Sequence, residues 1–290
     1  MRRGESTRQR DRGEQASEAE LPDVVTDHAR FDERSAGSHT LERALQLLKV
    51  FHGSAKPLPH AELVRRTGYS NASVSRLTAT LVALGYLDRA PDGVRVQIGV
   101  RGLRLGHKYL ANSPLPRIAR PIMQDFADRF DMSVGLAVAD QLDMIYIQYC
   151  NSPRIATLRL GVGRAVPMAL SSIGRAHVWS QPPELRQRLL FAIWKKSGEH
   201  GPQVVARMER AFDDLDSHGY CLAAGEYQRD TFAISVPLTL GTPPVPLGLN
   251  CSAVGALPDR ITIRDELAPA LKKTARLLTL ELENADSSLF

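Results

Sequence analysis

Residues 62–89 have the sequence ELVRRTGYSNASVSRLTATLVALGYLDR, and this stretch decides the fold of the first part of the chain. Apolar residues at helical spacing predict a short helix that ends at Gly68, because glycine adopts the left-handed backbone found after a helix without steric cost. Ser70 can cap a second helix over residues 71–84. The apolar stripe of that helix is Val74, Leu77, Leu81 and Leu84. Two helices joined by a tight turn containing glycine are typical of a helix-turn-helix.

The outer face of the second helix is suited to a DNA groove. It carries short hydrogen-bonding residues and a single arginine, with no acid among them: Asn71, Ser73, Ser75, Arg76 and Thr80. A face that is only solvated usually carries Glu–Lys pairs. A face that enters a groove must avoid carboxylates, because the phosphates repel them. This composition therefore predicts contact with DNA.

A β-hairpin is expected directly after the two helices. Residues 86–90 and 94–98 alternate as strands do, and the Pro91-Asp92-Gly93 sequence between them favours a turn. Such a hairpin makes the helix-turn-helix a winged one, with Arg89 and Arg95 at its tip. We expect the following arginines mainly to neutralise phosphates: Arg43, Arg65, Arg66, Arg89, Arg95 and Arg101.

The distribution of charge supports the same prediction. The chain has 290 residues and a net charge of +5. Residues 1–38 carry a net charge of −2, residues 39–111 of +7 and residues 112–290 of 0. All the excess positive charge therefore lies in the segment that contains the helix-turn-helix, which is the electrostatic pattern of a nucleic-acid-binding protein.

The chain divides into four parts. Residues 1–37 have almost no periodic apolar positions and are expected to be a disordered tail. The winged helix-turn-helix is expected over residues 38–99, starting with a helix capped by Thr40. A linker helix over residues 100–113 and an α+β domain over residues 114–285 follow.

The α+β domain is expected to have a mainly antiparallel, GAF-like sheet with helices packed on it. One of its strands is expected at residues 156–160. Its last helix is expected to begin at Thr262 as N-cap, with Pro269 either kinking it or shifting its start.

Several other classes of protein are disfavoured. No apolar run reaches the ~18 residues of a membrane span, and no apolar stretch follows the charged N-terminus, so we expect a cytoplasmic protein.

The three cysteines are Cys150, Cys221 and Cys251. Their odd number and wide spacing predict buried free thiols, with no disulfide framework and no metal site. No nucleophile elbow or phosphate-binding glycine loop is present, so neither catalysis nor a cofactor is expected. A ligand-binding enzyme and a ligand-independent architectural DNA-binding protein are the alternatives.

Four stretches together resemble one known family, that of the isocitrate lyase regulator (IclR), between about Thr40 and Leu280. TLERALQLLKVF at 40–51 resembles the family's opening helix, and residues 62–89 resemble its helix-turn-helix and first wing strand. VPMALSSIGRAHVW at 166–179 resembles the mouth of its effector pocket. GYCLAAGEYQRDTFAISVPL at 219–238 and LGLNCSA at 247–253 resemble the strands that line that pocket.

The resemblance implies a transcription regulator that binds a partly palindromic operator as a homodimer or homotetramer. It implies that Asn71, Ser73, Ser75 and Arg76 face the major groove. It also implies a pocket for a small organic acid or aromatic effector, lined by Ile155, Leu158, Val166, Ser171, Ser172, Ile173, Ala223, Thr231, Ala233, Asn250 and Ser252. The family often has a histidine at Ala169 and an acid at Ala223, so this pocket is expected to be more apolar. Donors for an acidic ligand are expected from Ser171, Ser172, Asn250, Ser252 and the backbone where the Ser171 helix begins.

Overall fold

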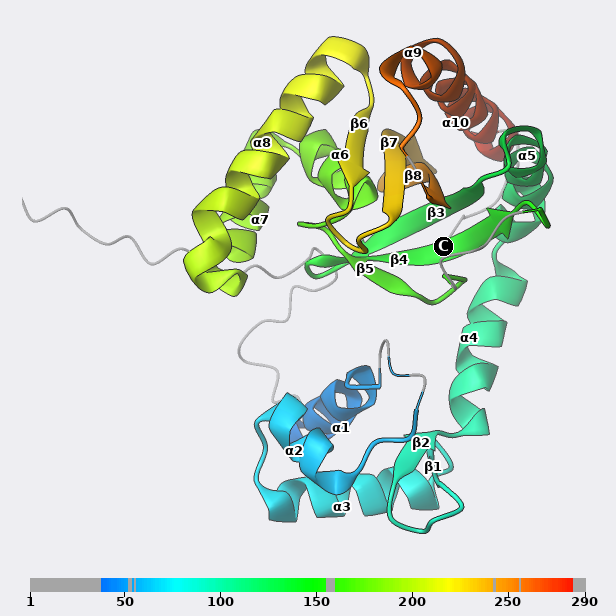
Figure 1. The fold of residues 1–290 in the computed structure, drawn as a ribbon. Coiled ribbons are helices and arrows are strands. Elements are labelled where there is room, and N and C mark those ends of the chain that lie inside the picture. The colour runs from blue at the N-terminus through cyan, green and yellow to red at the C-terminus, as the bar shows by residue number, and fades with distance from the viewer. Residues whose placement is uncertain are drawn as a thin grey trace, which may run out of the picture.

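The computed structural model describes residues 38–51, 54, 56–154, 160–241, 244–255 and 257–283. They form a small N-terminal unit and a larger α+β unit, joined by one helix (Figure 1). An ion pair of 3.5 Å between Lys49 Nζ and Asp140 Oδ2 also links the two units.

The N-terminal unit is a winged helix-turn-helix, as the sequence predicted. Its elements are α1 (His39–Lys49), α2 (His60–Thr67), α3 (Asn71–Ala83), β1 (Leu87–Arg89) and β2 (Val96–Ile98). Helix α2 ends at Gly68, whose φ of 68° lies in the left-handed region, and the side chain of Ser70 accepts a hydrogen bond from Ser73 N at the start of α3. Helix α1 starts at His39 with Ser38 at its N-cap, so the cap expected at Thr40 is wrong by two residues.

Helix α4 (Val100–Asn112) joins the two units, and it has no buried residue. Figure 1 shows it running from the wing to the start of α5 (Leu115–Phe130). A helix without a buried face is not stabilised by packing within its own chain, although its side chains at Leu103, Leu105 and Tyr109 are apolar.

The larger unit contains a six-stranded antiparallel sheet in the order β5-β4-β3-β8-β7-β6. The strands are β3 (Ser133–Asp140), β4 (Asp143–Asn151), β5 (Ala165–Pro167), β6 (Cys221–Ala224), β7 (Thr231–Leu240) and β8 (Val245–Val254). The predicted α+β class with a mainly antiparallel sheet is therefore confirmed. Strand β5 was not predicted, and residues 156–159 of the strand expected at 156–160 lie outside the described residues.

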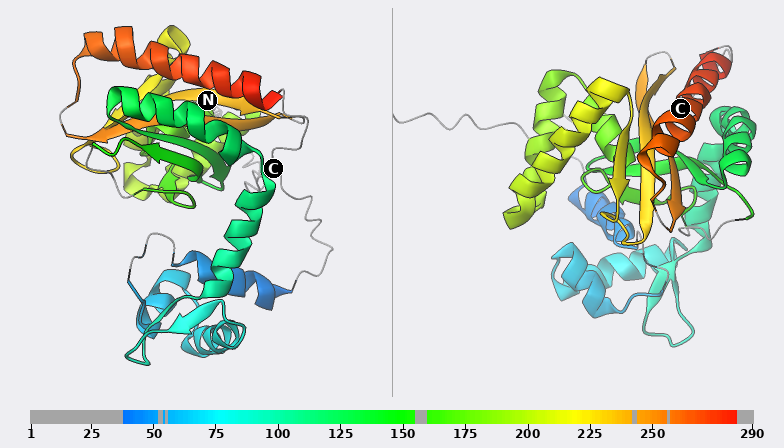
Figure 2. Two further views of the ribbon diagram at one scale, coloured as in Figure 1. Left: turned by 90° about the vertical axis from the view of Figure 1, so that its right-hand side faces the viewer. Right: turned by 45° about the horizontal axis from the view of Figure 1, so that its top comes forward.

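Helices cover both faces of this sheet (Figures 1 and 2). Helix α5 and the C-terminal helix α10 (Ala268–Glu283) pack on one face. The helices α6 (Ser172–Ser180), α7 (Pro183–Lys196) and α8 (Gly201–His218) lie on the other. Each face thus has its own apolar core, and strands β3 and β8 lie at the centre between them.

The C-terminal helical segment begins earlier than predicted. Asp259 caps the short helix α9 (Arg260–Thr262) by accepting bonds from the backbone N of Ile261 and Thr262, so the expected cap at Thr262 is wrong. A π-helical segment at Ile263–Leu267 then precedes α10. Pro269 has no N–H, and its ring would collide with the carbonyl four residues earlier in a regular helix. The widened turn accommodates that proline.

Helix α6 approaches the sheet so closely that two glycines are required. A Cβ at Gly174 would overlap with Met168 Cα and lie 2.6 Å from the Met168 carbonyl oxygen. A Cβ at Gly248 on β8 would lie 3.1 Å from the Ile173 carbonyl oxygen and overlap with the Ile173 side chain. The first turn of α6 is therefore held directly against β8.

We predict that Gly174→Ala destabilises the protein by at least about 3 kcal/mol, because the new methyl group meets backbone that cannot rotate away. Gly106→Ala is the matched control. Gly106 is exposed within α4 with no atom near its absent side chain, so alanine there should stabilise by about 0.5–1 kcal/mol. Thermal unfolding followed by circular dichroism measures both. Equal melting temperatures for the two variants would contradict this account of α6.

Candidate functional site

The exposed face of α3 carries most of the residues predicted to contact DNA. Asn71, Ser75, Arg76 and Thr80 are exposed. Among the described residues no hydrogen bond or ion pair engages the Arg76 guanidinium, so it is free to bind a partner. The Ser75 hydroxyl lies 3.1 Å from His60 Nε2 at the start of α2, which fixes Ser75 at the junction of the two helices.

Ser73 is the exception, and its placement on the outer face is wrong. Its side chain is only 9% exposed, and its hydroxyl accepts a hydrogen bond of 3.0 Å from the Ser70 hydroxyl. Ser73 is one turn before Leu77, so it shares the buried side of α3 with the apolar stripe. Ala72 and Ala79 are exposed beside Arg76 instead, which leaves the outer face smaller and more apolar than predicted.

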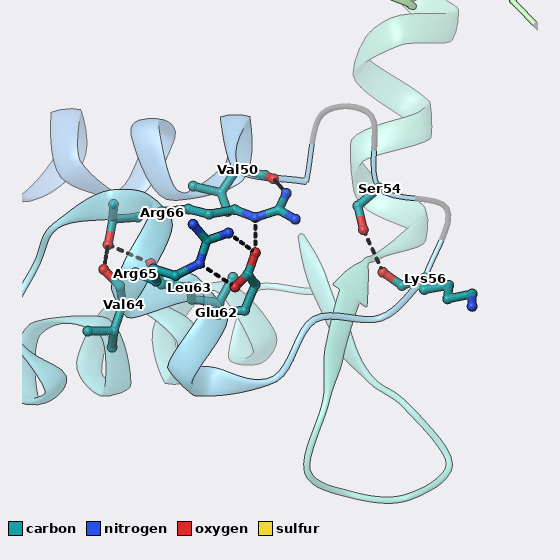
Figure 3. Close-up of polar contacts among 9 residues, drawn as sticks. Val50, Ser54, Lys56, Glu62, Leu63, Val64, Arg65 and Arg66 are labelled. Atoms are coloured by element: carbon teal, nitrogen blue, oxygen red, sulfur yellow. Dashed lines mark hydrogen bonds and ion pairs between the residues drawn. The ribbon is translucent and has the colours of Figure 1, made fainter.

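Arg65 and Arg66 both bind one carboxylate, that of Glu62 (Figure 3). Arg65 Nε donates to Glu62 Oε2 at 2.8 Å, and Arg66 Nε donates to Glu62 Oε1 at 2.5 Å. The hydrogen bonds from Arg65, the larger effect, and from Arg66 lower the pKa of Glu62 to about 2, so its carboxylate stays ionised. The other end of Arg66 donates to the Val50 carbonyl at 3.1 Å. The three side chains together contribute a net charge of only +1 to this surface.

The other basic residues of this unit are also partly engaged. Arg95 Nε donates to Asp92 Oδ2 at 2.5 Å, and bonds from the backbone and side chain of Arg95 lower the pKa of Asp92 to about 2. Arg89 donates to the Gly93 carbonyl at 3.2 Å and Arg101 to the Leu84 carbonyl at 2.7 Å. Both keep an uncompensated charge. Arg43 lies over the ring of Tyr69, 4.2 Å from its centroid.

The larger unit contains a small cavity between the first turn of α6 and the sheet. Its volume is about 40 Å³. Nine of the eleven residues expected to line an effector pocket line it: Val166, Ser171, Ser172, Ile173, Ala223, Thr231, Ala233, Asn250 and Ser252. The remaining two, Ile155 and Leu158, lie outside the described residues. The sequence missed Tyr146, Leu160, Leu170, Gly225, Glu226, Tyr227 and Phe232, which also line the cavity.

Polar atoms without partners lie in or beside this cavity. Asn250 Oδ1, Ser252 Oγ and the Tyr149 hydroxyl are buried and have no hydrogen bond of normal geometry among the described residues. Tyr146 lies near Asn250 and Tyr149 near Ser252, and burial raises the pKa of both phenols, which therefore remain protonated. Leaving buried polar groups unpaired is costly. A bound molecule with hydrogen-bonding groups would relieve that cost.

The two serines at the start of α6 are already engaged, contrary to their expected role as donors. The Ser171 hydroxyl donates to the Pro167 carbonyl at 2.7 Å and accepts from Gly174 N at 3.3 Å. The Ser172 hydroxyl lies 2.7 Å from the Ser235 hydroxyl on β7. These contacts hold the helix start in place, so Asn250 and Ser252 carry the free polar groups of the pocket.

One buried arginine lies beside the cavity, and the sequence analysis missed it. The Arg175 side chain is 3% exposed and binds Glu226, a lining residue, with both guanidinium Nη atoms. The signal in the sequence was an arginine between apolar residues in the segment at 166–179, where a solvated arginine is unexpected.

Comparison with known proteins places this architecture. Residues 40–91 match the IclR helix-turn-helix domain, and residues 107–279 match the domain described as bacterial transcriptional regulator IclR C-terminal. The chain belongs to the IclR family. It is therefore a DNA-binding transcription regulator, and the resemblance found in the sequence is confirmed.

Individual members of the IclR family support the assignment. A crystal structure of an IclR family transcriptional regulator from Brucella abortus is 32% identical, with a TM-score of 0.75 and coverage of 83% of this chain and 91% of that chain. The transcriptional regulator TsaQ1/TsaQ2 of Comamonas testosteroni is 29% identical over 256 residues, covering 85% of this chain and 89% of the relative. An IclR homologue from Microbacterium hydrocarbonoxydans, solved with 4-hydroxybenzoate, has the same fold at 20% identity and a TM-score of 0.64, covering 84% of this chain and 99% of that chain.

No group of three or more His, Cys, Asp or Glu side chains is arranged to hold a metal ion in the part of the chain that the structure describes. None of the described helices is long and apolar enough to cross a membrane.

We predict that Glu62→Gln strengthens binding to duplex DNA, because it frees Arg65 and Arg66 from a fixed negative charge. The logarithm of the binding constant should also fall more steeply with the logarithm of salt concentration, by about one unit for each charge released. Fluorescence anisotropy over a salt series measures both quantities. Glu184→Gln removes the same charge on α7, in the larger unit, and should change neither. Identical behaviour of the two variants would show that Glu62 does not limit the basic surface.

Proposed function

We propose that this regulator binds a palindromic operator as a dimer and is controlled by a small organic acid, most simply a benzoate, held between α6 and the sheet. The observation that carries the proposal is the cavity, in which Asn250 Oδ1 and Ser252 Oγ are buried without a hydrogen bond of normal geometry to any of the described residues. The 4-hydroxybenzoate bound to the Microbacterium relative makes benzoates the first ligands to test. The division into residues 38–99, 100–113 and 114–285 as DNA-binding, linking and effector or oligomerisation units is part of this proposal.

On DNA, the two α3 helices of a dimer would enter successive major grooves, about 34 Å apart. Arg76 is the residue best placed to contact a guanine edge or a phosphate, because its guanidinium is exposed and unengaged. Asn71 and Ser75 would contact bases or phosphates near the helix start. Arg89 and Arg101 would neutralise phosphates, with smaller contributions from the carboxylate-paired Arg65, Arg66 and Arg95.

The surface for dimer formation would be the apolar side of α1 and α4. A hollow of about 640 Å³ lies between these helices and α3. Exposed leucines line it from three helices: Leu41 and Leu45 on α1, Leu84 after α3, and Leu105 on α4. An apolar surface of this kind is unfavourable in water. Arg76 and Thr80 also line the hollow, on its α3 side. A second copy packed on the α1 and α4 side would cover the leucines there, leave Arg76 and Thr80 open to DNA and place two recognition helices side by side, as a palindromic operator requires.

Arg76→Ala should weaken operator binding by about 1–3 kcal/mol and relax specificity at one base position, if the contact is to a base edge. The wild-type protein should show a slope of about −5 for the logarithm of the binding constant against that of salt concentration, if about six phosphates are neutralised per dimer. A salt-titrated binding assay on the intergenic DNA beside its own gene measures both. A slope near zero would contradict the electrostatic part of this proposal.

Leu45→Glu should weaken self-association and lower operator affinity by about tenfold or more, because it places a charge in the proposed apolar interface. Ile261→Glu is the control, since Ile261 is equally exposed but lies on α9. Sedimentation velocity and operator binding report the two effects. If Leu45→Glu resembled the control in both, the interface would lie elsewhere.

A further inference from the structure

The cavity is too small for the ligand that the proposed function requires. Its volume is about 40 Å³, whereas a cavity that accommodates benzene in another protein measures about 150 Å³. Part of the wall must therefore move before an aromatic molecule can bind.

The sheet and α6 cannot easily provide the space. Gly174 and Gly248 bring the α6 backbone into direct contact with its neighbours, and Ser171 and Ser172 tie the helix start to Pro167 and Ser235. Movement there would break packing throughout the core, because protein interiors are close-packed.

The loop between β6 and β7, residues 225–230, forms a part of the cavity wall that belongs neither to the sheet nor to α6. It contributes Gly225, Glu226 and Tyr227 to the cavity wall. Gly225 has a φ of 68°, which gives the loop a conformationally permissive residue at its first position. Its backbone N donates to the Thr231 carbonyl at 2.8 Å, which closes the base of the loop. If the rest of the loop moved outward while this hydrogen bond stayed intact, the cavity would enlarge and strands β6 and β7 would keep their pairing.

Arg175 holds this loop in its closed position. Its Nη1 donates to Glu226 Oε1 at 2.8 Å and its Nη2 to Glu226 Oε2 at 2.5 Å, a bidentate pair. Nε and Nη2 also donate to the Ala169 carbonyl, at 3.3 Å and 3.1 Å. The bonds to the Ala169 carbonyl, just before α6, therefore hold the guanidinium in place without any contribution from the loop. Among the described residues, Glu226 is the only carboxylate that it binds.

Removing Glu226 alone would leave a buried and unpaired cation, which is strongly unfavourable. Replacing Glu226 by another carboxylate would preserve the bidentate pair, so the exchange would be close to neutral for Arg175. Glu226 would not be left unpaired either. Arg207 on α8 is 46% exposed and its Nη1 lies 3.6 Å from Glu226 Oε2, so it can remain the partner of Glu226 outside the cavity.

We propose that Arg175 is the carboxylate-binding residue of the pocket and that Glu226 occupies its place until an effector arrives. The effector is then a carboxylate on an apolar body, with a further polar group that meets Asn250 or Ser252. Its carboxylate displaces that of Glu226, and the loop opens with Glu226 retained by Arg207. This inference rests on the proposed function, because it assumes that the effector binds in this cavity.

The experiment compares benzoate with its neutral analogue benzamide, titrated by calorimetry into the full-length protein. Glu226→Gln keeps the shape of the side chain but weakens its competition for Arg175, so benzoate should bind about tenfold tighter and benzamide unchanged. Glu209→Gln on the exposed side of α8 is the matched control and should change neither affinity. Arg175→Gln should remove the preference for benzoate over benzamide.

The outcomes separate the proposal from its alternatives. If Glu226→Gln binds benzoate no better than the wild type, or gains equally for benzamide, Arg175 does not bind the carboxylate and the proposal is wrong. The result for Glu226→Gln decides even if Arg175→Gln fails to fold. Hydrogen exchange of residues 225–230 in the wild type should accelerate with benzoate, and unchanged exchange would also overturn the proposal. Binding of the same preparations to operator DNA tests the regulator function separately.

Discussion

The contact between α6 and the centre of the sheet is the constraint on which the effector unit depends. No side chain fits at Gly248, so the first turn of α6 lies directly on β8, and none fits at Gly174, where the same helix lies against the backbone of Met168. This contact places Ser172 and Ile173 opposite Asn250 and leaves only a small cavity between them. The same closeness that makes the core compact prevents the pocket from expanding there. Under the proposed function, the ligand would therefore have to enter by movement of the loop at residues 225–230.

Fewer arginines of the N-terminal unit are free of carboxylate partners than the net charge of its sequence indicates. A net charge of +7 over residues 39–111 indicates a broadly basic surface. In the structure, Glu62 and Asp92 each bind neighbouring arginines and reduce their effective charge. Arg76 on α3 has no such partner. If Arg76 contacts bases as proposed, pairing of the other arginines lowers the general attraction to phosphates and leaves that contact intact, an arrangement that favours specific over non-specific binding.

Much of the fold was predictable because local patterns agree with it. Gly68 and Ser70 mark the turn of the helix-turn-helix, and apolar periodicity located its two helices. Ser73 was misplaced because its polarity suggested an exposed position, whereas its spacing from Leu77 places it on the buried side. Strand β5 has only three residues and too little periodicity to be recognised. Pro269 was recognised as a disturbance, but the π-helical turn that accommodates it depends on the surrounding packing.

The candidate pocket was predictable for a different reason. Its lining residues come from four separated segments, and no periodicity brings Ser172 next to Asn250. Resemblance to a family supplied that set, and the structure brings nine of its residues together. It could not supply Arg175 and Glu226, which are 51 residues apart and are joined only by the fold. The unusual position of an arginine among apolar residues was the one local sign.

Hydroxyl-radical footprinting on the intergenic DNA beside its own gene tests most directly whether this chain is a dimeric, sequence-specific regulator. Two α3 helices related by a two-fold axis should protect two patches of backbone, centred about 10 base pairs apart and symmetric about a palindrome. Replacement of Arg76 by alanine should weaken both patches equally. A single asymmetric patch, or uniform protection without boundaries, would contradict the dimeric arrangement and the role of α3.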